Sequence, residues 1–220
     1  MKPAPIPADD AARVADLHAL NILDTKREAR FDRITELAAD VFDVKMCFIN
    51  LVDAKRQWFK STCGLQGVDE TSRELGFCAH AIFEPDVMIV PDATKDSRFS
   101  DNPFVTGDFG LRFYAGTVLH GPAGKPIGTL CLIDTAPKVR RTTSRAIEEV
   151  WGTCAGGIAS RVVSVASCPA RPGYERRCEA PLADAASPGR RGLALPASMP
   201  FESRFEQTLV WLQSRSWIVI

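Results

Sequence analysis

The sequence lacks an excess of charge of either sign. Its 220 residues include 27 Lys and Arg and 27 Asp and Glu, so the formal net charge is zero. A surface for nucleic acid or for an anionic membrane would need clustered basic residues, so we expect neither partner. The chain also lacks an apolar run of the roughly 18 residues that a membrane-spanning helix needs. Its opening residues, MKPAPIPADD, lack the apolar core of a signal peptide.

The cysteines lack the patterns that indicate disulfides or metal binding. There are seven of them, irregularly spaced and without a C-x-x-C pair, which favours reduced thiols in the cytoplasm. Cys78 and His80 stand close in sequence, but side chains two apart on a helix point about 200° apart, so we expect no shared metal ion. No Walker loop, G-x-G-x-x-G or Ser/His/Asp order is present, and His18 and His120 have no acidic neighbours in sequence. No catalytic residue is predicted.

What is present is organised around residues 112–134, which predict a β-hairpin. The first strand alternates apolar and other side chains with the period of two of a half-buried strand. Gly121-Pro122-Ala123-Gly124 supplies the turn. The return strand, residues 126–133, is apolar on both faces apart from Thr129, which is typical of a strand in the middle of a sheet.

The segments before the hairpin predict its partners. A helix from Asp9 has Val14, Leu17, Leu20 and Leu23 along one side. A second helix follows the capping box Thr25-x-x-Glu28 and runs to about residue 42, with an apolar stripe of Phe31, Ile34, Leu37, Ala38, Val41 and Phe42.

Shorter elements complete the predicted domain. Residues 46–52 predict a strand buried on both faces, and residues 57–63 a strand that returns beside it. A loop over 64–75, a short helix over 77–83 and a strand over 87–90 follow. Residues 92–110 form a long loop, which is usually functional or partly helical. A closing helix is expected over 144–163. Strands joined by hairpins, with helices gathered around them, indicate an α+β domain on an antiparallel sheet.

The composition changes at both ends of the chain. Residues 1–8 are a proline-rich lead-in that we expect to be disordered, and residues 9–165 form the domain. Residues 166–220 begin with a stretch rich in Pro, Arg, Ala and Gly that lacks the apolar periodicity of a core. We expect a disordered tail there, with a short apolar segment at its end.

Six blocks together resemble a known family. They are FDRITELAADVF, LVDAKRQWFKSTCGL, FCAHAI, VPDATKDSRFSDNP, RFYAGTVL and IGTLCLID, in this order. Over roughly residues 12–135 they are similar to bacterial GAF sensory domains of the type found at the N-terminus of histidine kinases and diguanylate cyclases. The resemblance implies a GAF/PAS-like central antiparallel β-sheet flanked by helices. Gly76 departs from it, because serine is expected ahead of FCAHAI.

The resemblance also implies a function. It points to a cytoplasmic signal-sensing module that binds a small molecule, a partner or both, without a catalytic output domain of its own. The ligand and any cofactor stay unidentified, and the partner is a second copy or a separate kinase or cyclase. One alternative is a thiol-dependent enzyme similar to free methionine sulfoxide reductases. Cys63 and Cys78 would then form its redox pair, because Cys47 and Cys131 lie in strands that are expected to be buried. Another alternative is a purely structural or dimerisation module.

GAF domains hold small ligands between the sheet and the helices and loops on one face. The residues that could line such a cup here are Trp58, Phe77, Cys78, His80, Asp92, Arg98, Phe99, Asn102, Arg112 and Tyr114. Arginines near aromatic rings and an aspartate suit a small polar or anionic ligand. The same residues also fit a structural network, in which Asp92 caps a turn, Arg98 pairs with Asp101 and Arg112 fixes the long loop to its strand.

Overall fold

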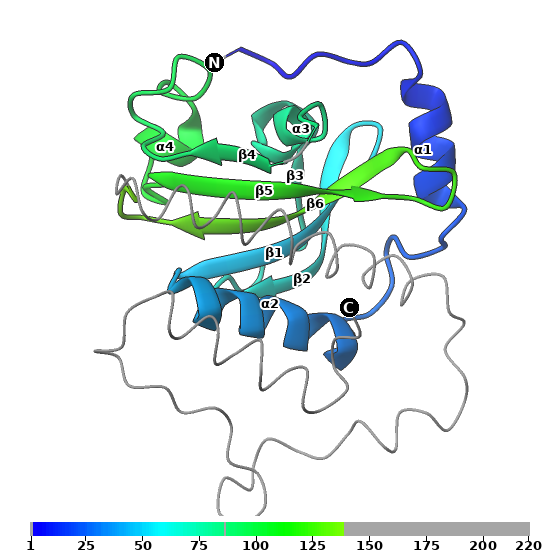
Figure 1. The fold of residues 1–220 in the computed structure, drawn as a ribbon, viewed down its shortest axis with the longest axis horizontal. Helices are drawn as coiled ribbons and strands as arrows, with labels where there is room; N and C mark the ends of the chain where they lie inside the picture. Colours follow the sequence, from blue (N-terminus) through cyan, green and yellow to red (C-terminus); the bar gives the residue numbers. More distant parts are fainter. Residues whose placement is uncertain (1, 86, 139–220) are drawn as a thin grey trace, which may run out of the picture. The chain divides into compact units, whose positions relative to one another are not determined.

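The computed structural model describes residues 2–85 and 87–138, which form a six-stranded antiparallel sheet with helices on both faces (Figure 1). In chain order the elements are α1 (Asp10–His18), α2 (Ala29–Phe42), β1 (Met46–Val52), β2 (Arg56–Cys63), β3 (Glu70–Ser72), the 3-10 turn η1 (Arg73–Leu75), α3 (Cys78–Ala81), β4 (Val87–Val90), α4 (Pro103–Thr106), β5 (Phe113–His120) and β6 (Pro126–Asp134). The predicted closing helix over 144–163 and the predicted tail over 166–220 lie outside the described residues. Within the described ranges, no helix is long and apolar enough to cross a membrane.

The predicted hairpin is confirmed, and its return strand lies in the middle of the sheet. The strand order is β3-β2-β1-β6-β5-β4, so β1 and β6 are central. Every residue of β1 is buried, as its continuous apolar run predicts. Gly128 of β6 stands opposite Leu51 of β1, and a Cβ there would overlap the backbone oxygen of Asn50. A glycine at this position therefore lets the two central strands pair closely.

Helix α2 covers one face of the sheet and contacts β1, β2 and β6. Its buried side chains are Phe31, Thr35, Ala38, Ala39 and Phe42. The predicted stripe is thus correct for Phe31, Ala38 and Phe42, whereas Ile34, Leu37 and Val41 are only half-buried. The predicted capping box is wrong. The Thr25 hydroxyl donates to the Ile22 carbonyl oxygen at 2.7 Å, and the helix begins at Ala29 without a side-chain cap.

Helix α1 lies at the end of the sheet where the turns β1–β2 and β5–β6 meet (Figure 1). The sequence predicts an apolar inner side of Val14, Leu17, Leu20 and Leu23, and this prediction is correct for Leu17 alone. The helix ends at His18, before Leu20, and the other residues it buries are Arg13 and Asp16. Charged side chains can occupy these positions because backbone groups of the strand ends bond them, as described below.

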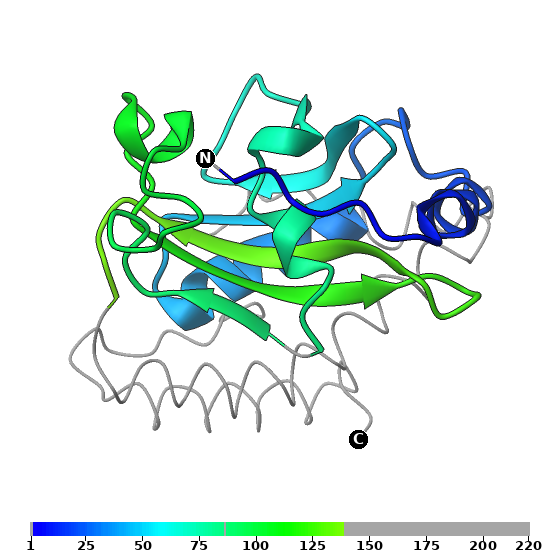
Figure 2. The ribbon, with the colours of Figure 1, turned by 90° about the horizontal axis from the view of Figure 1, so that it is seen from above.

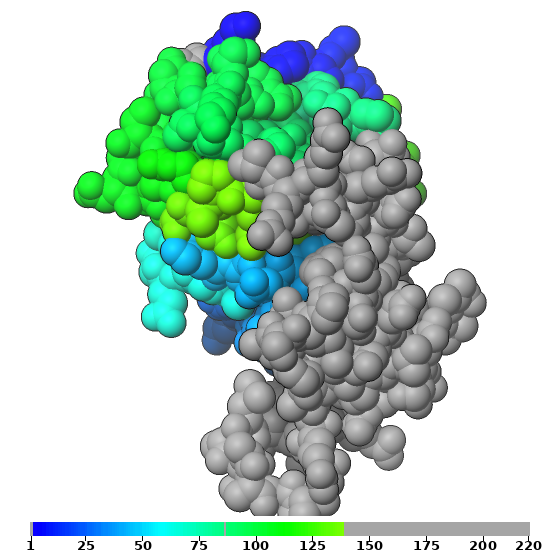
Figure 3. All heavy atoms as spheres, turned by 60° about the vertical axis from the view of Figure 1, so that its left-hand side comes forward, coloured from blue at the N-terminus to red at the C-terminus, as the bar shows by residue number. Residues whose placement is uncertain are grey.

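The opposite face of the sheet packs against α3, α4 and the segments that join them. Residues 64–75, predicted as loop, contain β3 and η1, and the long predicted loop over 92–110 contains α4. The green atoms in Figure 3, which include the segment that carries α4, form a continuous surface. The lead-in passes over the face of the domain that carries α3 (Figure 2). The carbonyl oxygen of Lys2 lies 3.2 Å from Nε2 of His80. The predicted disorder of residues 1–8 stays a prediction.

Candidate functional site: a cavity between the sheet and α3

A cavity of about 140 Å³ lies between the sheet and the segments that carry α3 and α4. Its walls come from β1, β2, β5 and β6 below and from the loops above, and most of them are apolar. The lining residues are Phe48, Asn50, Gln57, Phe59, Leu65, Val68, Thr71, Gly76, Phe77, Cys78, Phe104, Phe109, Leu111, Tyr114 and Ile133. Three of the ten residues predicted for a ligand site, Phe77, Cys78 and Tyr114, are among them, and the binding role of this hollow stays a prediction.

Two amides from neighbouring strands supply the polar part of this wall. Nδ2 of Asn50 donates to Oε1 of Gln57 at 3.2 Å, and Nε2 of Gln57 reaches the carbonyl oxygens of Ser72 and Arg73 at 3.3 and 3.4 Å. Asn50 is only 2% exposed, and its Oδ1 accepts no hydrogen bond from the described residues. A buried acceptor without a partner costs roughly 1–3 kcal/mol. The cavity wall thus contains one buried acceptor that has no partner among the described residues.

The predicted site residues Phe77, Cys78 and Tyr114 line the cavity together. The Tyr114 hydroxyl donates to Sγ of Cys78 at 3.4 Å, and burial raises the pKa of this tyrosine well above its ordinary value. Phe99 lies one layer away and stacks on Phe77, with ring centroids 3.9 Å apart. Of the predicted site residues, the structure thus brings Phe77, Cys78 and Tyr114 together at the cavity, with Phe99 behind them.

Trp58 lies on the opposite face of the sheet. Gln57 and Phe59 on either side of it line the cavity, and side chains alternate along a strand, so Trp58 points toward α2. Nζ of the fully buried Lys60 lies 5.8 Å from the Trp58 ring and 5.1 Å from the ring of Phe31 in α2. The sequence shows the alternation but not which face each set occupies.

The remaining charged residues of the predicted site form hydrogen bonds and ion pairs with nearby protein groups. Asp92 accepts from the amide and hydroxyl of Thr94, which lowers the pKa of its carboxyl group. Arg98 pairs with Asp96 at 2.8 Å and with Glu84 at 3.7 Å. The predicted pairing of Arg98 with Asp101 is replaced by these two.

Asn102 and His80 also have structural contacts. Asn102 is fully buried, accepts from the Phe104 amide and donates to the Leu75 carbonyl oxygen, both at 2.8 Å. His80 packs edge-on against Phe99 at 4.9 Å, and burial lowers its pKa. Neither side chain lines the cavity. Among the described residues, no group of three or more His, Cys, Asp and Glu side chains could hold a metal ion.

Arg112 holds the α4 segment against the start of β5. Its Nη1 donates to the carbonyl oxygens of Val105 at 2.8 Å and of Leu111 at 3.0 Å. We expect Arg112→Ala to lower the free energy of unfolding by about 1–2 kcal/mol, because a charged donor and two acceptors lose their bonds. Asp92→Ala should cost less than about 1 kcal/mol, since its bonds lie within one exposed turn.

Urea unfolding of both variants measures these losses, with Arg98→Ala as the matched control in the same segment. Neither Arg112→Ala nor Asp92→Ala should change the response to a ligand of the cavity. A variant that keeps wild-type stability but loses its ligand response would instead place that residue in a binding site.

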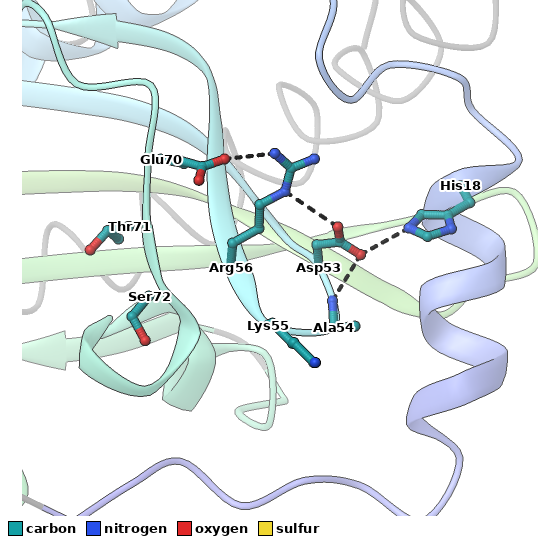
Figure 4. A pocket seen from close by; sticks show the side chains of 8 residues that line it. All are labelled: His18, Asp53, Ala54, Lys55, Arg56, Glu70, Thr71 and Ser72. Carbon is teal, nitrogen blue, oxygen red and sulfur yellow. Dashed lines mark hydrogen bonds and ion pairs between the residues drawn. The ribbon is translucent and has the colours of Figure 1, made fainter.

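A second, open groove lies beside α1 and is built from charged side chains (Figure 4). Asp53 accepts from Nε2 of His18 and from the Ala54 amide, both at 2.8 Å, and Arg56 bonds Glu70 at 2.6 Å. Asp53 lies far from His18 in sequence, which is why the sequence showed no acidic partner for this histidine. Because these groups satisfy one another, the groove serves to fasten α1 to the turn between β1 and β2.

The fold and its cavity define a sensory-type α+β domain. The chain matches the GAF domain family over residues 26–157, which is more than half of its length, and it belongs to this family. A cyclic di-GMP phosphodiesterase of Pseudomonas aeruginosa is 38% identical over 138 residues. The alignment covers 63% of this chain but only 23% of that protein, so this chain spans less than a quarter of its relative's length.

Solved structures with a similar fold are distant in sequence. The free methionine-R-sulfoxide reductase of Neisseria meningitidis is 16% identical, with a TM-score of 0.49, over 76% of this chain and 98% of that chain. The GAF domain of an Acinetobacter phosphoenolpyruvate-protein phosphotransferase is 17% identical, with a TM-score of 0.44, over 71% and 98%.

Proposed function

We propose that this GAF domain is a cytoplasmic, non-catalytic sensor that binds a small, uncharged molecule in the cavity beneath α3. The observation that carries the proposal is the unpartnered Oδ1 of Asn50, a residue of the mostly apolar cavity wall. A ligand with an N–H or O–H group would satisfy this acceptor and bury its apolar part against the surrounding rings. Asp92, Arg98 and Arg112, which the sequence suggested for an anionic ligand, are bonded to other protein groups and do not line the cavity. A neutral ligand therefore fits better than an anion.

The cavity volume limits the ligand's size. About 140 Å³ is well below the roughly 300–1,000 Å³ of pockets that hold drug-sized ligands. Nucleotides and bilins are therefore too large for this conformation, whereas molecules of a few non-hydrogen atoms fit. We propose that the bound state is read by a partner, either a second copy or a separate output protein. The relative's name makes an output that acts on cyclic di-GMP one candidate.

A thermal-shift screen tests the ligand proposal. We expect small neutral donors such as amides and alcohols to raise the melting temperature, and nucleotides, oxoacids and bilins to have no effect. A ligand at one hundred times its Kd stabilises the folded state by about 2.7 kcal/mol. Asn50→Leu should abolish the shift while keeping the stability of the unliganded protein within about 1 kcal/mol, because the removal of an unsatisfied acceptor offsets the loss of the Asn50–Gln57 hydrogen bond.

Trp58→Phe is the matched control, since Trp58 lies on the other face of the sheet. It should leave the ligand-induced shift unchanged. A shift that survives in Asn50→Leu, or that only anionic compounds produce, would contradict the proposed ligand class. Size-exclusion chromatography with and without the ligand measures whether a second copy is the partner.

A further inference from the structure

Two buried cysteines from distant parts of the sequence meet beside the cavity. Cys78 begins α3 and Cys131 lies in the central strand β6, and their Sγ atoms are 3.8 Å apart. They come together because α3 packs on β5 and β6. For the alternative of a thiol-dependent enzyme, the sequence analysis named Cys63 and Cys78 as the redox pair, but Cys63 stands opposite Cys47 in the β1–β2 ladder. The structure therefore replaces the expected pair with a different one.

The surroundings make the two thiols unequal. Burial raises the pKa of Cys131 well above its ordinary value. Burial also acts to raise the pKa of Cys78, but hydrogen bonds at its sulfur outweigh this effect, with Cys131 the largest contributor, and the pKa is lowered. The Tyr114 hydroxyl is one of these donors, and it has room because a Cβ at Gly116 would overlap it. Cys78 therefore loses its proton to form a thiolate more easily than Cys131 does.

Only one of the two cysteines is part of the cavity wall. Cys78 and Tyr114 line it, whereas Cys131 lies behind them and is fully buried. A volume of about 140 Å³ exceeds what a single water molecule needs, so a hydroperoxide as small as hydrogen peroxide fits. Cys78 would thus meet the oxidant first, with Cys131 already in position to react with it.

We propose that Cys78 and Cys131 form a reversible disulfide when the domain encounters a hydroperoxide. The Cys78 thiolate attacks one peroxide oxygen, so an S–O bond forms, the O–O bond breaks and the leaving oxygen departs as water or alcohol after taking up a proton. The Cys131 sulfur then attacks Cys78, the S–S bond forms, and the sulfenic oxygen leaves as water. Two thiols are oxidised, one hydroperoxide is reduced, and a dithiol reductant reverses the step.

Disulfide formation requires the two sulfurs to come closer together. The sulfurs must approach from 3.8 Å to about 2.0 Å, and β6 is held on both sides by β1 and β5. The four-residue helix α3 has fewer constraints and is the element that moves. The chemistry at the two sulfurs does not depend on the proposed ligand function.

Peptide mapping of the full chain tests the disulfide. The reduced protein is freed of reductant, treated with hydrogen peroxide at stoichiometric amounts, alkylated with N-ethylmaleimide, digested and analysed by mass spectrometry. We expect a peptide pair linked through Cys78 and Cys131 that loses two hydrogen atoms and disappears on treatment with dithiothreitol. Cys78→Ser and Cys131→Ser should each abolish it.

Cys47→Ser and Cys63→Ser are the matched controls, since these two cysteines stand opposite each other in the same sheet but do not line the cavity. Both variants should retain the Cys78–Cys131 linkage at the wild-type yield. Wild-type mapping alone can overturn the proposal, without reliance on any variant. Cys78 recovered as sulfinic acid or as the alkylated thiol, with no linked peptide, would show that the two sulfurs do not join.

Discussion

Replacing Asp10 with alanine should lower the free energy of unfolding by about 2–3 kcal/mol. The carboxylate of Asp10 bonds Nε of Arg13 at 2.7 Å and the two terminal nitrogens of Arg73 at 2.7 and 2.9 Å. The side chains of Arg13 and Arg73 are only 1% and 7% exposed. Removing the shared carboxylate leaves two buried guanidinium groups without a counter-charge, which costs about 3–5 kcal/mol in a fully buried pair.

The expected loss is smaller than that limit for two reasons. Asp10 keeps 16% of its side chain exposed, and both arginines retain backbone acceptors, the carbonyl oxygens of Val52 and Ala54. Urea unfolding measures the loss, and Asp9→Ala is the matched control. Asp9 pairs with Lys125 on the surface, so its replacement should leave the unfolding midpoint nearly unchanged. Equal losses in the two variants would show that the buried arginines do not depend on Asp10.

The same carboxylate predicts a pH dependence with a definite sign. The hydrogen bond from Arg73 is the main cause that lowers the pKa of Asp10 from 3.8 to about 2. A carboxyl group whose folded-state pKa is lowered stabilises the protein above its unfolded pKa and loses that contribution as the pH falls through the folded pKa. The stability difference between wild type and Asp10→Asn should therefore shrink between about pH 4 and pH 2, by up to about 2 kcal/mol.

The elements that were predicted well are those whose type is determined by the pattern of their own residues. The central strand β1 is a continuous apolar run. The hairpin combines an alternating first strand with glycines at its turn. The type of each element therefore follows from its own residues. In helix α1, by contrast, the residue pattern does not show which side is buried. Its buried Arg13 and Asp16 bond Val52 and Ala123, which lie 39 and 107 residues away. No local pattern distinguishes such charged residues from a solvated helix face, so the inner side was predicted from the leucines and Val14.

The cavity illustrates the same limit. Phe77, Cys78 and Tyr114 were predicted because the family blocks contain them, and Trp58 was misplaced because alternation does not specify the face. Asn50 was missed because it stands in a run of seven residues, MCFINLV, that is otherwise apolar. One polar residue within a buried strand is a signal that could have been used. A buried amide needs partners, and here the sheet supplies Gln57 for one of its two polar atoms.

Gly76→Ser is expected to destabilise the domain by about 2–3 kcal/mol, although serine is the residue that the family resemblance predicts at this position. A Cβ at residue 76 would overlap the side-chain amide of Gln57. The amide would have to move away and lose its bonds to Asn50, Ser72 and Arg73, at roughly 1 kcal/mol each. The gain from serine capping is only a few tenths of a kcal/mol.

A double-mutant cycle assigns this cost to one contact. In a Gln57→Ala background the space above residue 76 is empty, so Gly76→Ser should cost less than about 0.5 kcal/mol there, and the coupling energy should be about 2 kcal/mol. Urea unfolding of the four proteins supplies the numbers. An equal cost in both backgrounds would mean that serine strains the backbone between η1 and α3 instead. Coupling would show that Gly76 and Gln57 belong together, with glycine making room for the amide that bonds Asn50 at the cavity wall.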